Sequence, residues 1–212
     1  MTAGAWFAFG WVAGCALVGL FRLITAWQQK APVLPDRLLL ALALLLTAAA
    51  DYFMVLMRQN TEGLCCFLAV QLFYFVRLRR PWRFLAVSGA AAACLVLLCP
   101  GFGITPGTEG GLAILYMILF AGNLWSSRQL KRGRGERLFV WGLLLFFLCD
   151  LNVGVMNLGE YLRLPVFYRK WIRPFCSGIL WLFYLPSQVL LSFSDCYRIT
   201  ERKAESMKKE RR

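Results

Sequence analysis

The chain alternates long apolar runs with short polar segments, and each run is close to the length that a helix needs to cross a bilayer. A turn rich in proline and glycine, from Pro100 to Gly107, separates the fourth run from the fifth. The pattern therefore predicts an all-α fold: a polytopic transmembrane helix bundle of about seven spans within residues 1–197, followed by a basic tail over residues 198–212. The predicted spans are approximately 5–27, 38–57, 61–78, 84–100, 111–127, 137–157 and 174–194.

Composition supports a membrane protein and excludes other classes. Apolar residues make up 59% of the chain and aromatic residues 15%, and the charges are confined to the segments between apolar runs, which excludes a soluble globular domain. In a soluble protein, a net charge of +13 would suggest a nucleic-acid partner. Here the positive-inside rule accounts for most of the Lys and Arg residues. We therefore expect no nucleic-acid partner and a multi-pass protein of the cell membrane.

The loop charges also predict the direction in which the chain crosses the membrane. With seven spans, most of the 24 Lys and Arg residues fall on one side, in loops 28–37, 79–83 and 128–136 and in the tail. Because cationic loops face the cytoplasm, we expect the N-terminus outside and the C-terminus in the cytoplasm. The basic tail would then lie near anionic lipid headgroups. A basic loop at 158–173, on the other side, weakens this contrast.

The eight cysteines do not indicate a disulfide framework or a metal site. They lie in or beside the apolar runs without any C-x-x-C pair, as small apolar side chains do. The chain has no histidine, which removes the nitrogen ligand of a zinc site and the base that would activate a thiol. We therefore expect no metal and no cofactor.

Two aspartates stand inside apolar runs, and they are the candidate catalytic residues. Asp51 and Asp150 each lie about thirteen residues beyond the predicted cytoplasmic start of their span, so a rise of 1.5 Å per residue places them at a similar depth. A charge there costs about 2.5–3.5 kcal/mol on membrane-insertion scales and commonly marks a functional site. We predict that both carboxyl groups converge on one polar cavity. The alternative is two separate, inert hydrogen bonds to neighbouring helices.

Other polar side chains are expected to line the same cavity. Two carboxyl groups that share a site of low polarity hold one proton between them, an arrangement that cleaves acid-labile C–O bonds. The substrate would be an amphiphile that enters from the bilayer. The predicted substrate-binding residues are Gln71, Tyr74, Asn123, Asn152, Tyr184 and Gln188, with Tyr116 and Asn157 as further candidates for the lining.

Two stretches around these aspartates resemble a known family. The run AADYFMVLMRQNTEGLCCFLAVQLFY contains Asp51, and the run WGLLLFFLCDLNVGVMN contains Asp150. Both are similar to the YhhN-type membrane family, which includes lysoplasmalogenases, and the resemblance covers about residues 38–194. The chain departs from the family pattern in three ways. It has seven predicted spans where the family has eight, Ala50 stands in place of a glycine, and Gln71 stands in place of a histidine.

The resemblance implies a membrane hydrolase that cleaves the vinyl ether of a lysoplasmalogen to a fatty aldehyde and a glycerophospho-base. In this interpretation Asp51 and Asp150 are catalytic: one donates a proton and the other stabilises the resulting cation. The rival interpretation is a non-catalytic protein that binds a lipid, or transports a small molecule, through the same cavity. Gln71 favours the rival because an amide cannot shuttle a proton as imidazole does, whereas the two retained aspartates favour the enzyme. A homo-oligomer is compatible with either.

Overall fold

The structure, a computed structural model, describes residues 3–29, 34–78, 80–102, 104–130 and 133–210, with side chains as far as Ser194. This part of the chain forms seven α-helices, two π-helical segments, one 3₁₀ segment and no strand, which confirms the predicted all-α bundle. The side chains of the predicted basic tail, 198–212, lie outside the described residues. The elements are α1 (Ala3–Gln28), α2 (Leu34–Asp51), η1 (Tyr52–Met57), α3 (Asn60–Arg77), α4 (Arg83–Leu98), η2 (Cys99–Phe102), α5 (Gly107–Ser127), α6 (Arg134–Tyr161), η3 (Tyr168–Ile172) and α7 (Arg173–Glu210).

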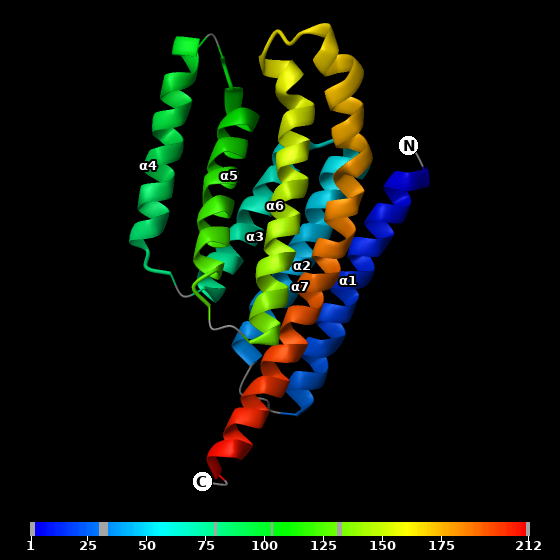
Figure 1. The fold of residues 1–212 in the computed structure, drawn as a ribbon, viewed down its shortest axis with the longest axis vertical. Helices are drawn as coiled ribbons and strands as arrows, with labels where there is room; N and C mark the ends of the chain where they lie inside the picture. Colours follow the sequence, from blue (N-terminus) through cyan, green and yellow to red (C-terminus); the bar gives the residue numbers. More distant parts are fainter. Residues whose placement is uncertain (1–2, 30–33, 79, 103, 131–132, 211–212) are drawn as a thin grey trace.

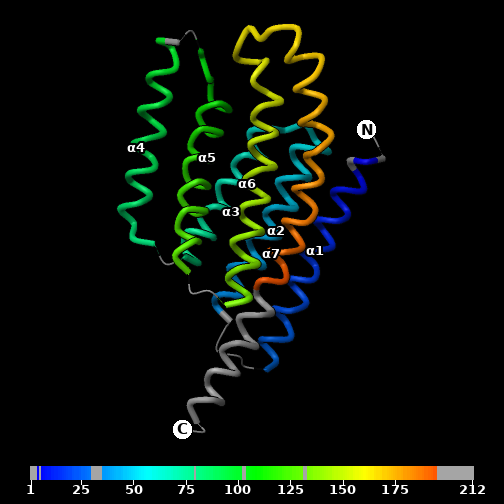
Figure 2. Tube along the Cα trace, in the orientation of Figure 1, coloured from blue at the N-terminus to red at the C-terminus, as the bar shows by residue number. Residues whose placement is uncertain are grey.

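The helices form an up-and-down bundle, with α6 and α7 in front of α3 and α2 in the view of Figure 1. α2 packs against α1 and α3, and α7 packs against α1, α2 and α6. α5 contacts α3 and α6 on one side and α4 on the other, so that α4 lies at the edge of the bundle. Successive helices alternate in direction, and therefore α3, α5 and α7 run one way while α2, α4 and α6 run the other (Figure 2).

Six helical segments among the described residues are long and apolar enough to cross a membrane, and α3 is the exception among the seven helices. α3 has 18 residues, and its mean hydropathy is lowered by Glu62, Gln71 and Arg77. Gln71 and Arg77 are buried inside the bundle, so these two polar side chains face the protein, whereas Glu62 is exposed. The predicted direction of the chain relative to the two sides of the membrane stays a prediction.

The close approach of α6 and α7 depends on Gly142. A Cβ atom at this position would lie 2.9 Å from Leu191 Cγ and 3.2 Å from the Leu191 backbone nitrogen. Contacts this short leave no room for a side chain, and small residues let helix backbones meet in this way inside membrane bundles. Because Gly142 is about two helical turns from Asp150 on α6, the contact fixes α7 beside the helix that carries one of the two acids.

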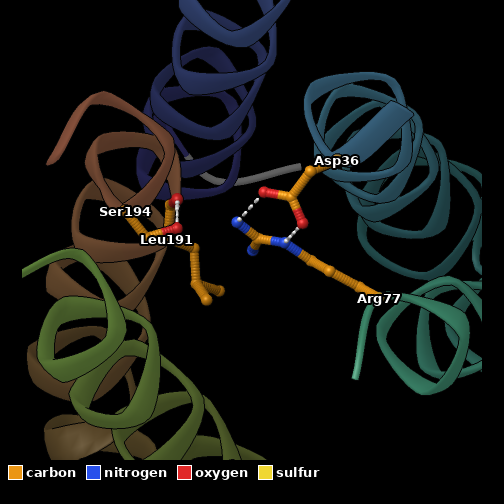
Figure 3. A network of polar contacts seen from close by, with 4 residues as sticks. All are labelled: Asp36, Arg77, Leu191 and Ser194. Atoms are coloured by element: carbon orange, nitrogen blue, oxygen red, sulfur yellow. Dashed lines mark hydrogen bonds and ion pairs between the residues drawn. The ribbon is translucent and has the colours of Figure 1, made fainter. Parts of the chain in front are cut away.

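A buried ion pair joins the end of α3 to the start of α2 (Figure 3). Arg77 donates from Nε to Asp36 Oδ1 at 3.1 Å and from Nη2 to Asp36 Oδ2 at 3.3 Å. The side chain of Arg77 is 2% exposed and that of Asp36 is 17% exposed. The Arg77 guanidinium also lies 4.5 Å from the centre of the Phe139 ring. A guanidinium that meets both oxygens of a carboxylate fixes geometry as well as charge, and this pair therefore ties α3 to α2.

Replacing Arg77 with leucine is expected to destabilise the protein by about 3 kcal/mol, because it takes the guanidinium away from a largely buried carboxylate. The double variant Asp36→Leu/Arg77→Met removes both charges and is expected to recover most of that loss. Thermal unfolding of the purified protein measures both effects. Arg83→Leu, at an exposed position at the start of α4, is the control and should stay within about 0.5 kcal/mol of the wild type. Equal unfolding temperatures for Arg77→Leu and the control would show that the pair contributes nothing.

Candidate functional site

Asp51 lies at a change in the helical backbone. α2 ends at this residue, and the chain continues as η1, a wider π-helical turn. Arg58 then adopts the left-handed conformation, with φ 58°, and donates its backbone N–H to Phe53 O, which ends the turn before α3 begins. π-helical turns are frequent at functional sites. The backbone thus places a carboxyl group where a regular helix gives way to a wider one.

The Asp51 carboxyl is bound by a tyrosine from the other end of the chain. Tyr184 of α7 donates from its hydroxyl to Asp51 Oδ2 at 2.6 Å. Asp51 is 7% exposed and Tyr184 is 4% exposed, so the bond forms inside the bundle. A phenol stabilises a buried carboxyl group without adding a charge of its own, which offsets part of the cost of burial. The same bond links α2 to α7.

Asp150 has a matching partner on a different helix. Tyr116 of α5 donates from its hydroxyl to Asp150 Oδ2. The tyrosine is 4% exposed, and its ring centre lies 5.8 Å from that of Phe67 on α3. Each acid is therefore held by one phenol, and the two phenols come from α5 and α7.

Phe146 connects the two tyrosine–aspartate pairs. Its ring is fully buried, and its centre lies 5.7 Å from that of Tyr184 and 5.9 Å from that of Phe67, which itself packs against Tyr116. Phe146 also lies about one helical turn before Asp150 on α6. Edge-on and tilted aromatic contacts of this kind restrain ring orientation, so one aromatic cluster fixes the positions of both phenols.

Both acids line one cavity of about 820 Å³. This volume is within the range of pockets that take up small ligands. Most of the lining away from the acids is apolar, and it includes Val55, Leu64, Ile114, Met117, Leu158 and Trp181. An apolar cavity that contains two acids suits a molecule with a hydrocarbon chain and one reactive polar group.

The cavity extends to a polar rim, formed where α5 begins and α6 ends. Glu109 and Glu160 are exposed and line this rim. Thr61 donates to Glu109 Oε1 at 3.1 Å, and Tyr161 packs close to Gly110. Neither glutamate was predicted from the sequence to be part of the site. In the sequence, Glu109 stands just before the fifth apolar run and Glu160 just after the sixth. Only the fold brings these two ends together.

The structure separates the predicted site residues into groups. Asp51, Asp150 and Tyr184 come together at the cavity, as do the further candidates Tyr116 and Asn157. Asn152 is not part of the lining, and its side-chain amide donates to Leu148 O at 2.6 Å. The remaining four predicted residues are fully buried outside the lining: Gln71, Tyr74, Asn123 and Gln188. The predicted contacts of these five non-lining residues with substrate stay predictions.

The groups that can exchange a proton with a bound molecule at the inner end of the cavity are the two carboxyl groups and their phenol partners. Cys149 also lines the cavity beside Asp150, and its thiol is buried. Among the described residues, no group of three or more Asp, Glu or Cys side chains is placed to hold a metal ion. The inner end of the cavity thus brings together two carboxyl groups and the two phenols that donate to them.

The fold and site define a polytopic helical membrane protein with a pair of tyrosine-bound aspartates at an internal cavity. The chain belongs to the YhhN family, whose family model matches residues 9–194. This match confirms the resemblance found in the sequence. Searches of the curated proteins and of the solved structures found no significant match to the chain.

Filling the cavity is expected to block the uptake of an amphiphile without unfolding the protein. Gly154 lines the cavity, and a Cβ atom there would meet nothing within 4 Å. Gly154→Leu should therefore occupy open space and also remove a glycine from a helix, which favours stability. Native mass spectrometry with an added lysophospholipid is expected to show at least tenfold weaker binding. Gly178→Leu is the matched control, since this exposed glycine of α7 is also in open space but outside the lining. Equal lipid binding by both variants would contradict the assignment of the cavity.

Proposed function

We propose that this protein is a hydrolase of the lysoplasmalogenase type, which acts in the cell membrane on the vinyl ether bond of a lysoplasmalogen. The observation that carries the proposal is the pair of aspartates, Asp51 and Asp150, at one apolar cavity. Membership of the YhhN family supports the class of protein. The chemistry of the residues supports the reaction, because vinyl ethers are opened by acid.

The reaction would begin with transfer of a proton to the β-carbon of the vinyl ether. One aspartic acid donates its proton to the β-carbon of the vinyl ether, and the electron pair of the carbon–carbon double bond forms the new C–H bond. The product is an oxocarbenium ion, which the other, ionised carboxylate stabilises at close range. Protonation of carbon is the difficult step, and a positioned acid next to a carboxylate lowers its barrier.

Water then completes the cleavage. A water molecule adds to the cationic carbon while the carboxylate accepts one of its protons. The resulting hemiacetal loses its glycerol oxygen as an alcohol, which takes up a proton as the C–O bond breaks. The products are a fatty aldehyde and a glycerophospho-base. The carboxyl group that took the proton from water gives a proton to the glycerol oxygen, and the other carboxylate takes the proton of the hemiacetal hydroxyl, so both acids return to their starting state.

The tyrosines act by holding the two carboxyl groups. Each phenol donates to one carboxyl oxygen, Oδ2, of its aspartate. The other oxygen of each carboxyl group, Oδ1, is then available for the proton that moves during the reaction. Fixing both groups before substrate binds reduces the reorganisation that the transition state requires.

A second candidate function is non-catalytic binding of a lipid, or transport of a small molecule, through the same cavity. The observation in its favour is Gln71, because an amide stands where the family pattern has histidine. Gln71 lies outside the cavity lining, with Asn123 Nδ2 donating to its Oε1 at 3.1 Å. Its side chain lies beside Tyr116, which binds Asp150, so a residue at this position can influence the acid through that phenol without lining the cavity.

Asp51→Asn and Asp150→Asn are each expected to lower turnover of a lysoplasmalogen at least about a hundredfold, because either change removes a proton donor or a charge from the reaction. The amide has nearly the shape of the carboxyl group, so both variants should fold. The measurement is release of fatty aldehyde by purified protein. Glu62→Gln, which makes the same change at an exposed position outside the cavity, should keep wild-type turnover.

Full activity in either aspartate variant would exclude this mechanism. If the wild type releases no aldehyde from lysoplasmalogens with different headgroups, yet retains lipid after purification and loses it in Gly154→Leu, the binding function is the correct one.

A further inference from the structure

A layer of unusually polar side chains lies directly beyond the cavity. We call Gln71, Tyr74, Asn123 and Gln188 the rear polar layer; all four are fully buried and none lines the cavity. They follow the cavity-lining residues of α3, α5 and α7, and these three helices run in the same direction (Figure 1). The layer therefore lies on the side of the two acids that is opposite to the polar rim.

The rear polar layer is connected to both acids through their tyrosines. Gln188 lies about one helical turn beyond Tyr184, which binds Asp51. The side chain of Gln71 lies beside Tyr116, which binds Asp150. Behind each carboxyl group there is thus a phenol, and next to each phenol there is a buried glutamine.

Three polar atoms of this layer have no hydrogen-bond partner among the described residues, and a fourth, Gln71 Nε2, has none besides the neighbouring Tyr116 hydroxyl. Two of them can donate, Gln71 Nε2 and the Tyr74 hydroxyl, and two can only accept, Asn123 Oδ1 and Gln188 Oε1. Two members of the layer are hydrogen-bonded to each other: Asn123 Nδ2 donates to Gln71 O at 2.9 Å and to Gln71 Oε1 at 3.1 Å. Each buried polar atom without a partner costs roughly 1–3 kcal/mol. The hydrogen bonds within the layer therefore leave two donor atoms and two acceptor atoms that a further molecule could bind.

We propose that the rear polar layer binds ordered water molecules that supply the water consumed by hydrolysis at Asp51 and Asp150. Water both donates and accepts, and buried water commonly makes about three hydrogen bonds to polar groups left over by the fold. A water molecule can therefore donate to Asn123 Oδ1 or Gln188 Oε1 and accept from Gln71 Nε2 or the Tyr74 hydroxyl. The second half of the proposal rests on the proposed function.

The reaction requires a source of water that bound substrate does not block, and water in the rear polar layer would be such a source. A lysoplasmalogen that fills the apolar cavity excludes water from that side, yet each turnover consumes one water molecule. Water held behind the tyrosines reaches the oxocarbenium carbon from the opposite side: its oxygen forms the new C–O bond and one of its protons passes to the ionised carboxylate. The hemiacetal then releases the glycerol alcohol and the aldehyde. Gln71 and Gln188 are positioning residues in this step, since they act through the water.

X-ray radiolytic labelling of the protein in lipid nanodiscs tests the water directly, because hydroxyl radicals formed from bound water oxidise the side chains next to it. Tyr74 is expected to be oxidised several-fold faster than Tyr168. Tyr168 is the matched control: it is also a buried tyrosine, at 5% exposed, but its hydroxyl donates to Val155 O. Labelling of Tyr74 that is no faster than that of Tyr168 would overturn the proposal, whatever the protein's activity.

Kinetics test the role of this water in the reaction. Gln71→Leu and Gln188→Leu should each lower kcat about tenfold or more with KM within twofold, because neither glutamine lines the cavity, and should slow the labelling of Tyr74. Ser194→Ala, which removes a buried hydroxyl bonded to Leu191 O, should change neither. Unchanged kcat in both glutamine variants, or a rise in KM alone, would contradict the supply of water from this layer. A wild type without hydrolase activity would instead refute the proposed function and leave the labelling experiment to decide whether the water is bound.

Discussion

The structure depends on how two carboxyl groups are accommodated inside a helical membrane bundle. A buried carboxyl group needs a partner, because the apolar interior supplies no solvation. Here the partner of each is a neutral phenol, Tyr184 for Asp51 and Tyr116 for Asp150. No basic side chain is bonded to either acid among the described contacts, and the hydrogen bond of each carboxyl group is the one from its tyrosine. An arginine partner would hold a carboxylate as a permanent ion, as Arg77 does for Asp36, whereas a phenol leaves the pair able to gain and lose a proton.

The rest of the fold serves this arrangement. The phenols come from α5 and α7, and the acids come from α2 and α6, so four helices must hold their positions for the two bonds to form. Gly142 allows α6 and α7 to meet closely. Phe146 packs against Tyr184 on one side and, through Phe67, against Tyr116 on the other. The cavity and the rear polar layer then lie on opposite sides of the acids. One side accepts hydrocarbon and the other leaves polar groups that water can satisfy.

Much of this architecture could be predicted from the sequence, because its main signals are local. The apolar runs predicted the helices, and a charge inside an apolar run identified Asp51 and Asp150 without knowledge of the fold. The hydrogen-bond partners were harder to assign: Tyr184 and Tyr116 were only two among several polar candidates, and pairing depends on helix packing across the bundle. Phe146 is one of many phenylalanines, so nothing local distinguishes it. Glu109 and Glu160 belong to the rim only because the ends of α5 and α6 meet, and the π-helical turn after Asp51 has no evident sequence signal.

Asp51 and Asp150 are expected to act as one pair across a shared cavity, so that each carboxyl group responds to the protonation of the other. Infrared difference spectroscopy of their carboxyl stretching bands tests it most directly, with the wild type, Asp51→Asn, Asp150→Asn and the double variant compared in nanodiscs. If the two acids share a proton, removing one must alter the band of the other, and the two single-variant changes will not sum to that of the double variant. Strictly additive changes would mean that each carboxyl group titrates by itself, and they would contradict the account.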